Sequence, residues 1–109
     1  MKKYPLGEFE EVVLLTVGVL FDEAYGVAIK DEIEKRLDRK VSVGALQSAL
    51  RRMEQKGYLD SRLGETANER GGKRKRFFRI TAYGKRALEY THDIRQGLWK
   101  DIPNIALDF

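Results

Sequence analysis

The sequence predicts a mainly α-helical fold that contains one small β-hairpin. Three observations support this fold class. Helical patterns fill the first half of the chain, two short extended runs flank a basic stretch that contains Gly71 and Gly72, and a long helical pattern follows. A chain of 109 residues is long enough for one domain with a modest core.

The first two helices are predicted at residues 8–21 and 25–37. The first is apolar on most sides, and such a helix in a small protein lies at its centre or faces a second copy. The second is amphipathic, because Tyr25, Ile29, Ile33 and Leu37 recur at every fourth position. A short polar connection at residues 38–40 follows it.

A third helix is predicted from Ser42, whose hydroxyl suits the N-cap, to about Lys56. Gly57 suits the left-handed position just beyond its end. One face of this helix is apolar and consists of Leu46, Ala49, Leu50 and Met53. The opposite face carries no carboxylate and consists of Gly44, Gln47, Ser48, Arg51 and Gln55, with Arg52 on its flank. An ordinary solvated face would mix Glu and Lys, so this face is predicted to bind a ligand.

The hairpin and the last helix complete the predicted elements. Extended strands are expected at about 59–66 and 75–81, with the reversal at residues 69–72. Thr81 is expected to cap a helix over about 82–100, which ends before Pro103. One stripe of this helix consists of Ala87, Tyr90, Thr91, Ile94 and Leu98.

Positive charge is concentrated on the hairpin. The chain carries a net charge of +4, but residues 62–86 contain nine basic and two acidic residues and so carry +7. Such a distribution favours a polyanionic partner, either nucleic acid or an anionic membrane surface. Membrane binding would need apolar anchor residues near the charge, and the hairpin lacks them. The longest apolar run, at residues 12–21, is too short to span a bilayer.

Several classes of protein do not fit the sequence. The chain has no cysteine, so disulfides and thiolate metal sites are excluded. His92 is the only histidine, and no nucleophilic triad or phosphate-binding loop is visible. We therefore expect no enzyme, no metal and no cofactor. The N-terminus lacks the apolar segment of a signal peptide, which predicts a cytoplasmic protein.

The order of elements is that of a winged helix-turn-helix, in which the third helix enters the major groove of DNA and the hairpin, or wing, lies along the backbone. Glutamine can pair with adenine and arginine with guanine. The expected DNA contacts from the third helix and the wing are Ser42, Gly44, Gln47, Ser48, Arg51, Arg52, Arg70, Lys73, Arg74, Lys75 and Arg76. A winged helix that binds structured RNA or an acidic protein remains the alternative.

Four stretches of the chain resemble the PadR-type transcriptional regulators. They are LGEFEEVVLL at 6–15, AYGVAIKDEIE at 24–34, VGALQSALRRMEQKGYL at 43–59 and RGGKRKRFFRITAYGKRAL at 70–88. The resemblance implies a homodimer that binds operator DNA, usually as a repressor, and the two-fold symmetry of such a dimer predicts a palindromic operator. It also implies the short subgroup, with a winged-helix domain at 1–81 and a dimerisation helix and tail at 82–109.

The resemblance also assigns roles to single residues. It places Tyr25 near the DNA backbone, although the spacing of Tyr25 predicts packing as well. Family members commonly carry a tyrosine where this chain has Gln47, so the family's contact at that position cannot be copied. The expected dimer interface consists of Phe9, Val12, Val13, Leu88, Thr91, Ile94, Leu98 and Trp99. Trp99 either packs against the partner or lines a pocket between protomers, where a small aromatic effector binds in some short members.

Overall fold

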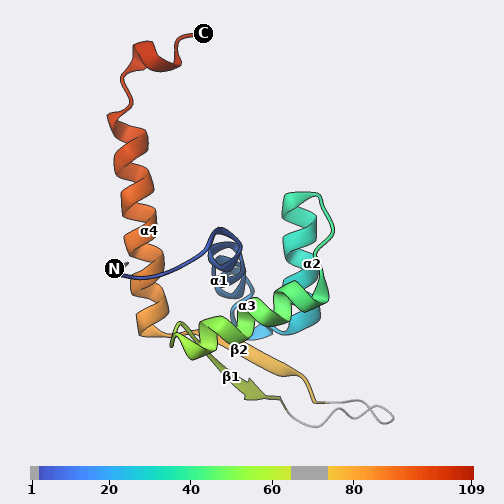
Figure 1. Ribbon diagram of the computed structural model, residues 1–109. Helices are drawn as coiled ribbons and strands as arrows, with labels where there is room; N and C mark the ends of the chain where they lie inside the picture. Colours follow the sequence, from blue (N-terminus) through green and yellow to red (C-terminus); the bar gives the residue numbers. More distant parts are fainter. Residues whose placement is uncertain (1–2, 65–73) are drawn as a thin grey trace.

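A computed structural model describes residues 3–64 and 74–109, and it has the winged-helix arrangement (Figure 1). The elements, in chain order, are α1 (Glu8–Leu20), η1 (Phe21–Glu23), α2 (Gly26–Leu37), α3 (Val43–Gln55), β1 (Leu59–Leu63), β2 (Arg76–Ile80), α4 (Ala82–Asp101) and η2 (Asn104–Leu107). The helices begin and end within one or two residues of their predicted bounds. The predicted reversal at 69–72 lies outside the described residues.

The core lies where α1, α2 and α3 meet. Val13, Leu14 and Val17 of α1 are buried there, together with Ile29 and Ile33 of α2. The predicted apolar face of α3 is confirmed, because its four residues are at most 1% exposed. The expectation that α1 is buried on most sides is only partly right, since Leu15 and Val19 are exposed to solvent.

The turn between α2 and α3 is fixed by local hydrogen bonds. Asp38 adopts the left-handed conformation at the end of α2, with a φ of 53°. A carboxylate oxygen of Glu34 then accepts a hydrogen bond from the backbone amide of Val41, at 2.7 Å. The hydroxyl of Ser42 accepts from the amide of Ala45 at 3.2 Å, which confirms the predicted N-cap of α3. At the other end of α3, Gly57 has a φ of +82°, as predicted.

Strand β2 is held along both of its edges. On one side it pairs antiparallel with β1, so that Leu59 lies opposite Ile80 and Leu63 lies opposite Arg76. On the other side, the amide of Phe78 donates a hydrogen bond to the carbonyl of Ala24 at 2.8 Å, in the segment before α2. The base of the wing is therefore tied directly to the helix-turn-helix.

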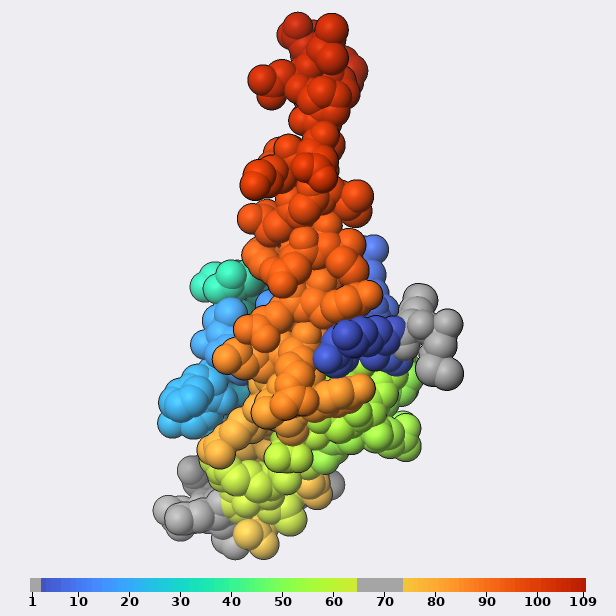
Figure 2. All heavy atoms as spheres, turned by 90° about the vertical axis from the view of Figure 1, so that its left-hand side faces the viewer, coloured from blue at the N-terminus to red at the C-terminus, as the bar shows by residue number. Residues whose placement is uncertain are grey.

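Helix α4 is packed on the body only at its start. Thr81 caps it by accepting a hydrogen bond from the amide of Gly84 at 3.0 Å, and Gly84 and Ala87 are buried. From His92 to Asp101 every residue is exposed, and this half of the helix rises away from the body (Figures 1 and 2). The radius of gyration is 16.7 Å, whereas a compact chain of this length has about 13 Å. None of the described helices is both long and apolar enough to cross a membrane.

Candidate nucleic-acid interface

An open cleft of about 520 Å³ lies between the starts of α2 and α3 and the base of the wing. Its lining combines apolar, amide and basic side chains from these three elements. The lining residues are Tyr25, Gly26, Val27, Lys30, Val43, Leu46, Gln47, Arg74, Lys75, Arg76 and Phe78. The fold thus brings the predicted wing cations and the first part of the third helix to one site.

The outer face of α3 is arranged as predicted. Gly44, Gln47 and Arg51 are exposed, and Ser48 is half-buried. The side-chain nitrogen of Gln47 lies 3.4 Å from the position that a Cβ atom on Gly26 would occupy. The Gln47 amide therefore lies against the first turn of α2 and inside the cleft, where it is available to a ligand that enters.

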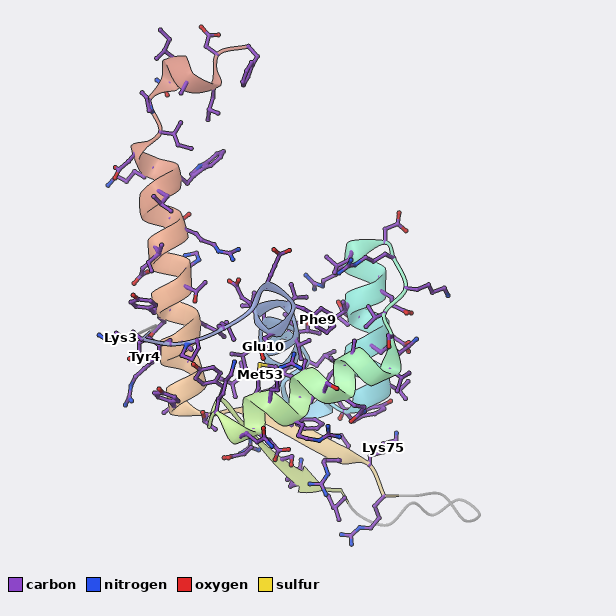
Figure 3. All side chains as sticks on the ribbon, in the orientation of Figure 1. Lys3, Tyr4, Phe9, Glu10, Met53 and Lys75 are labelled. Carbon is purple, nitrogen blue, oxygen red and sulfur yellow. The ribbon has the colours of Figure 1, made fainter. Side chains whose placement is uncertain are left out.

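Arg52 forms an ion pair that the sequence did not predict. Its Nε donates a hydrogen bond at 2.7 Å to Glu10 of α1, which also accepts from the Nζ of Lys56 at 2.9 Å. The Glu10 side chain thus links α1 to α3 (Figure 3). This ion pair gives Arg52 a structural role, and because its side chain is still 50% exposed, the expected DNA contact stays a prediction.

The pKa of the Glu10 carboxyl reflects this pairing. Burial alone raises the pKa, but hydrogen bonds from Arg52, from the amide of Gly7 and from Lys56 outweigh it and lower the pKa from 4.5 to about 2. Glu10 is therefore ionised under physiological conditions, and it fixes the C-terminal half of α3 to the central helix.

The wing cations are held by neutral groups. The Nε of Arg74 donates to the carbonyl of Gly64 at 2.8 Å, and Arg76 donates to the hydroxyl of Ser61 at 3.0 Å. The Nζ of Lys75 lies 4.2 Å from the centre of the Tyr25 ring, at the point where the wing leaves the body (Figure 3). Within residues 3–64 and 74–109, none of these cations forms an ion pair with a carboxylate. Arg70 and Lys73 lie outside the described residues.

Tyr25 joins the wing to the helix-turn-helix. It forms an isolated antiparallel bridge with Phe77, and the two rings meet edge to face with their centroids 5.6 Å apart. Its half-buried side chain agrees with the predicted packing role. The ring also lines the cleft beneath Lys75, and its expected position near the DNA backbone stays a prediction.

Sequence reasoning missed the three other cleft residues whose side chains are not buried, namely Val27, Lys30 and Val43. Lys30 pairs with Glu34 at 3.1 Å, while Val27 and Val43 are 63% and 59% exposed. Val43 could have been found from spacing, because it lies four residues before Gln47 and therefore on the same side of the helix. Val27 could not have been found from spacing, since its place in the cleft depends on how the wing packs against the start of α2.

Comparison with known proteins identifies the family. Residues 14–90, from α1 into α4, match the transcriptional regulator PadR-like family, which is more than half of the chain. The chain belongs to the PadR-like family of transcriptional regulators. The family predicted from the four sequence stretches is therefore confirmed. Among curated protein sequences, no relative matches the chain.

Solved PadR-like structures have the same fold. A PadR-like transcription factor from Bacteroides fragilis is 21% identical with a TM-score of 0.71, over 89% of this chain and 88% of that one. A PadR family regulator from Clostridium difficile is 25% identical with a TM-score of 0.62, over 82% of this chain and 91% of that one. Bacillus subtilis PadR, solved in complex with operator DNA, is 17% identical with a TM-score of 0.60, over 78% of this chain and 46% of that one. The predicted winged-helix fold is therefore confirmed as well.

This PadR-like chain also exposes an apolar surface away from the cleft. Leu15 and Val19 of α1 and Ile94 and Leu98 of α4 are exposed, and they belong to the two elements expected at a dimer interface. Of the other residues expected there, Phe9, Val12, Leu88 and Thr91 are half-buried. Val13 must be excluded, because it is fully buried in the core of its own chain and offers no surface to a second copy.

Trp99 lies on the side of α4 that faces α1. It follows Arg95 by four residues, and Arg95 forms an ion pair with Glu11 of α1 at 2.9 Å. The Trp99 side chain is 67% exposed. Packing against a partner and lining a pocket between protomers both require such an exposed ring.

Proposed function

We propose that this PadR-like regulator is a DNA-binding repressor that acts as a homodimer on a palindromic operator. The observation that carries the proposal is the composition of the cleft. The cleft combines Gln47, from the outer face of α3 that carries no carboxylate, with wing cations that form no ion pair among the described residues. Binding to DNA requires no metal and no cofactor. A protein with this function must share a compartment with the DNA, which is the cytoplasm in a cell without a nucleus.

The proposed docking follows from dimensions and charge. An α-helix about 10–12 Å wide fits the major groove, which is about 12 Å wide. With α3 in the groove, Gln47 and Arg51 face base edges, while Gly44 allows close approach of the backbone. The wing then follows the sugar-phosphate backbone, where Lys75 and its neighbours replace condensed counterions. Bacillus subtilis PadR, solved with operator DNA, shares the fold and supports this arrangement.

A homodimer accounts for the apolar surface on α1 and α4. Leu98 and Trp99 are exposed in a single chain, and a second copy packed on this surface would remove them from water. Two-fold symmetry would then repeat α3 on the DNA, which predicts a palindrome with half-sites separated by about one helical turn, ~34 Å. A dimer bound across a promoter excludes polymerase without further contacts, and this favours repression over activation.

The decisive experiment is a salt titration of binding to a duplex selected from a random pool, followed by fluorescence anisotropy. If the dimer neutralises about six phosphates, log K falls with log salt at a slope of about −5. Lys75→Gln removes one charge from each protomer, so it should make the slope shallower by about 2. Lys35→Gln is the matched control, because Lys35 lies in the last turn of α2, at the end away from the cleft.

Arg51→Ala tests the role of α3 separately. It should cost about 1–3 kcal/mol at particular base pairs and relax the sequence preference there. An equal loss on all duplexes would reassign Arg51 to a phosphate contact. A slope near zero, or tighter binding to structured RNA than to duplex DNA, would overturn the proposed function. Transcription in vitro from a template with the selected site should fall as the protein is added, and a rise would show activation.

A further inference from the structure

Val43 is an exposed apolar residue at the point where α3 enters the cleft. It is the first residue of the helix, directly after the Ser42 cap, and 59% of its surface is open to water. A valine at this place adds nothing to the cap, and its branched side chain makes it a weaker helix former than many polar residues. Its methyl groups line the cleft together with the Gln47 amide. The chain thus presents an apolar group and an amide side by side to any ligand that enters.

The surroundings of this pair restrict the chemistry of the ligand. Lys75 and the other wing cations line the same cleft, and the Nζ of Lys75 is held 4.2 Å from the centre of the Tyr25 ring. A ligand that fits therefore carries negative charge at its edge and both apolar and hydrogen-bonding groups farther in. Duplex DNA has this pattern, with phosphates at the rim of the major groove and base edges on its floor. Among the four bases, only thymine presents a methyl group there.

The spacing of the two side chains matches that of base pairs. Residues four apart in a helix are separated by about 6 Å along the axis and have Cβ atoms about 5–6 Å apart. Stacked base pairs are about 3.4 Å apart. Val43 and Gln47 can therefore reach the same base pair or two neighbouring ones. An A·T pair offers both of the groups that they require, because adenine binds an amide through two hydrogen bonds and thymine offers its C5-methyl group.

We propose that Val43 determines specificity by contacting the C5-methyl of a thymine, in or next to the base pair whose adenine is bound by Gln47. The inference rests on the proposed function and deepens it, since it assigns an A·T base pair to each half-site. Val27 lines the same cleft and is similarly exposed, but it belongs to α2. In helix-turn-helix proteins the first helix crosses the backbone while the second reads the bases. The thymine contact is therefore assigned to Val43 and not to Val27.

The test replaces each thymine of the selected operator in turn by deoxyuridine, which pairs identically but lacks the methyl group. At one position in each half-site, the wild-type protein should bind roughly fourfold less tightly, the factor expected for one buried methyl group. Val43→Ala should bind the thymine and deoxyuridine duplexes equally. Val27→Ala, the matched control, should keep the wild-type difference. Circular dichroism and an unchanged salt slope establish that both variants are folded and still bind the backbone.

Each outcome decides between the claims. The inference is wrong if no thymine position is sensitive to its methyl group, if the selected half-site contains no A·T pair, or if the sensitivity survives in Val43→Ala. Loss of the sensitivity in Val27→Ala alone would move the contact to α2 and overturn the assignment as well. In all these cases salt-dependent binding to duplex DNA would leave the proposed function intact. Absence of any duplex binding would overturn both.

Discussion

The winged-helix body and the outer half of α4 differ in how far their apolar residues are buried. In the body, Val13, Leu50 and Met53 are completely or almost completely buried by the chain itself. In the outer half of α4, from His92 to Asp101, Ile94 and Leu98 lie open to water. An isolated helix of this length is marginal in water. The contrast teaches that the body can be stabilised within one chain, whereas the outer half of α4 would be stabilised by the second copy of the proposed dimer.

The strongest way to break this comparison is a charge on the outer half of α4. Leu98→Asp removes two leucines from the proposed dimer interface, each worth about 2 kcal/mol, and so should raise the dimer dissociation constant about a thousandfold. Sedimentation analysis over a range of concentrations should show a monomer, while the unfolding of the body should hardly change. Such a result would show that the two regions are stabilised independently.

Lys100→Asp is the matched control, because Lys100 lies on the opposite side of α4 from Leu98. It introduces the same side chain in the same helical turn and should leave the dimer intact. A wild-type protein that is already monomeric at high concentration would contradict the dimer. Equal disruption by both variants would show that the interface covers the whole circumference of the helix.

The next largest effect is expected inside the body, at Glu10. Its pKa in the folded protein is about 2, below the ordinary value of 4.5, so the ionised form stabilises the fold. This shift corresponds to about 3 kcal/mol, which is fully present above pH 4.5 and is lost as the pH falls toward 2. Glu10→Gln should therefore lower the free energy of unfolding by about 3 kcal/mol at pH 7, and denaturant titrations should show the difference closing near pH 2.

Glu11→Gln measures how much the junction between the body and α4 contributes to stability, for comparison with Glu10→Gln inside the body. Glu11 binds Arg95 of α4, whose side chain is 62% exposed, across the junction between the body and α4. An ion pair so open to water contributes at most about 1 kcal/mol. A loss for Glu11→Gln as large as that for Glu10→Gln would mean that the junction is as important to stability as the body.

A smaller effect is expected where α4 begins. A Cβ atom at Gly84 would lie 2.3 Å from the backbone oxygen of Tyr58, and neither backbone can give way easily. Gly84→Ala should therefore cost about 1–3 kcal/mol in the free energy of unfolding, as overpacking does elsewhere. Thermal unfolding measures this cost, and an unchanged melting temperature would show that α4 is not docked tightly on the body.

The smallest effect has the opposite sign and concerns Gly97 of the same helix. Nothing in the described part of the chain lies within 4 Å of a Cβ atom placed there. Gly97→Ala should therefore stabilise α4 by about 0.5–1 kcal/mol, because alanine restricts the unfolded chain and favours a helix. A loss of stability or of dimer would instead locate Gly97 in close contact with the partner.

Much of the fold could be predicted from local chemistry. Ser42 and Thr81 form the predicted caps, Gly57 ends α3 as expected, and the apolar face of α3 is buried. Each of these features depends on residues within one or two turns, so a helical spacing rule is sufficient to find it. The outer face of α3 was predicted for the same reason.

The errors concern contacts between distant segments. The ion pair between Arg52 and Glu10 was not predicted, because Glu10 lies 42 residues earlier, and the DNA contact of the half-exposed Arg52 stays a prediction. Val13 was expected at the dimer interface, yet it faces the core, because periodicity alone does not show which side of an apolar helix is covered by other helices. The cleft residue Val27 was missed for a related reason, since the wing that lines the same cleft comes much later in the chain.

The two neighbours of β2 have a consequence for solubility. A strand with an open edge is a template to which another chain can add, and this is a common route to aggregation. In this protein β1 covers one edge of β2, and the segment around Ala24 and Tyr25 covers part of the other. The outer strand β1 is only five residues long and carries Asp60 and Arg62, charges that discourage strand addition. The hairpin can thus remain exposed to solvent between binding events without promoting fibrous self-assembly.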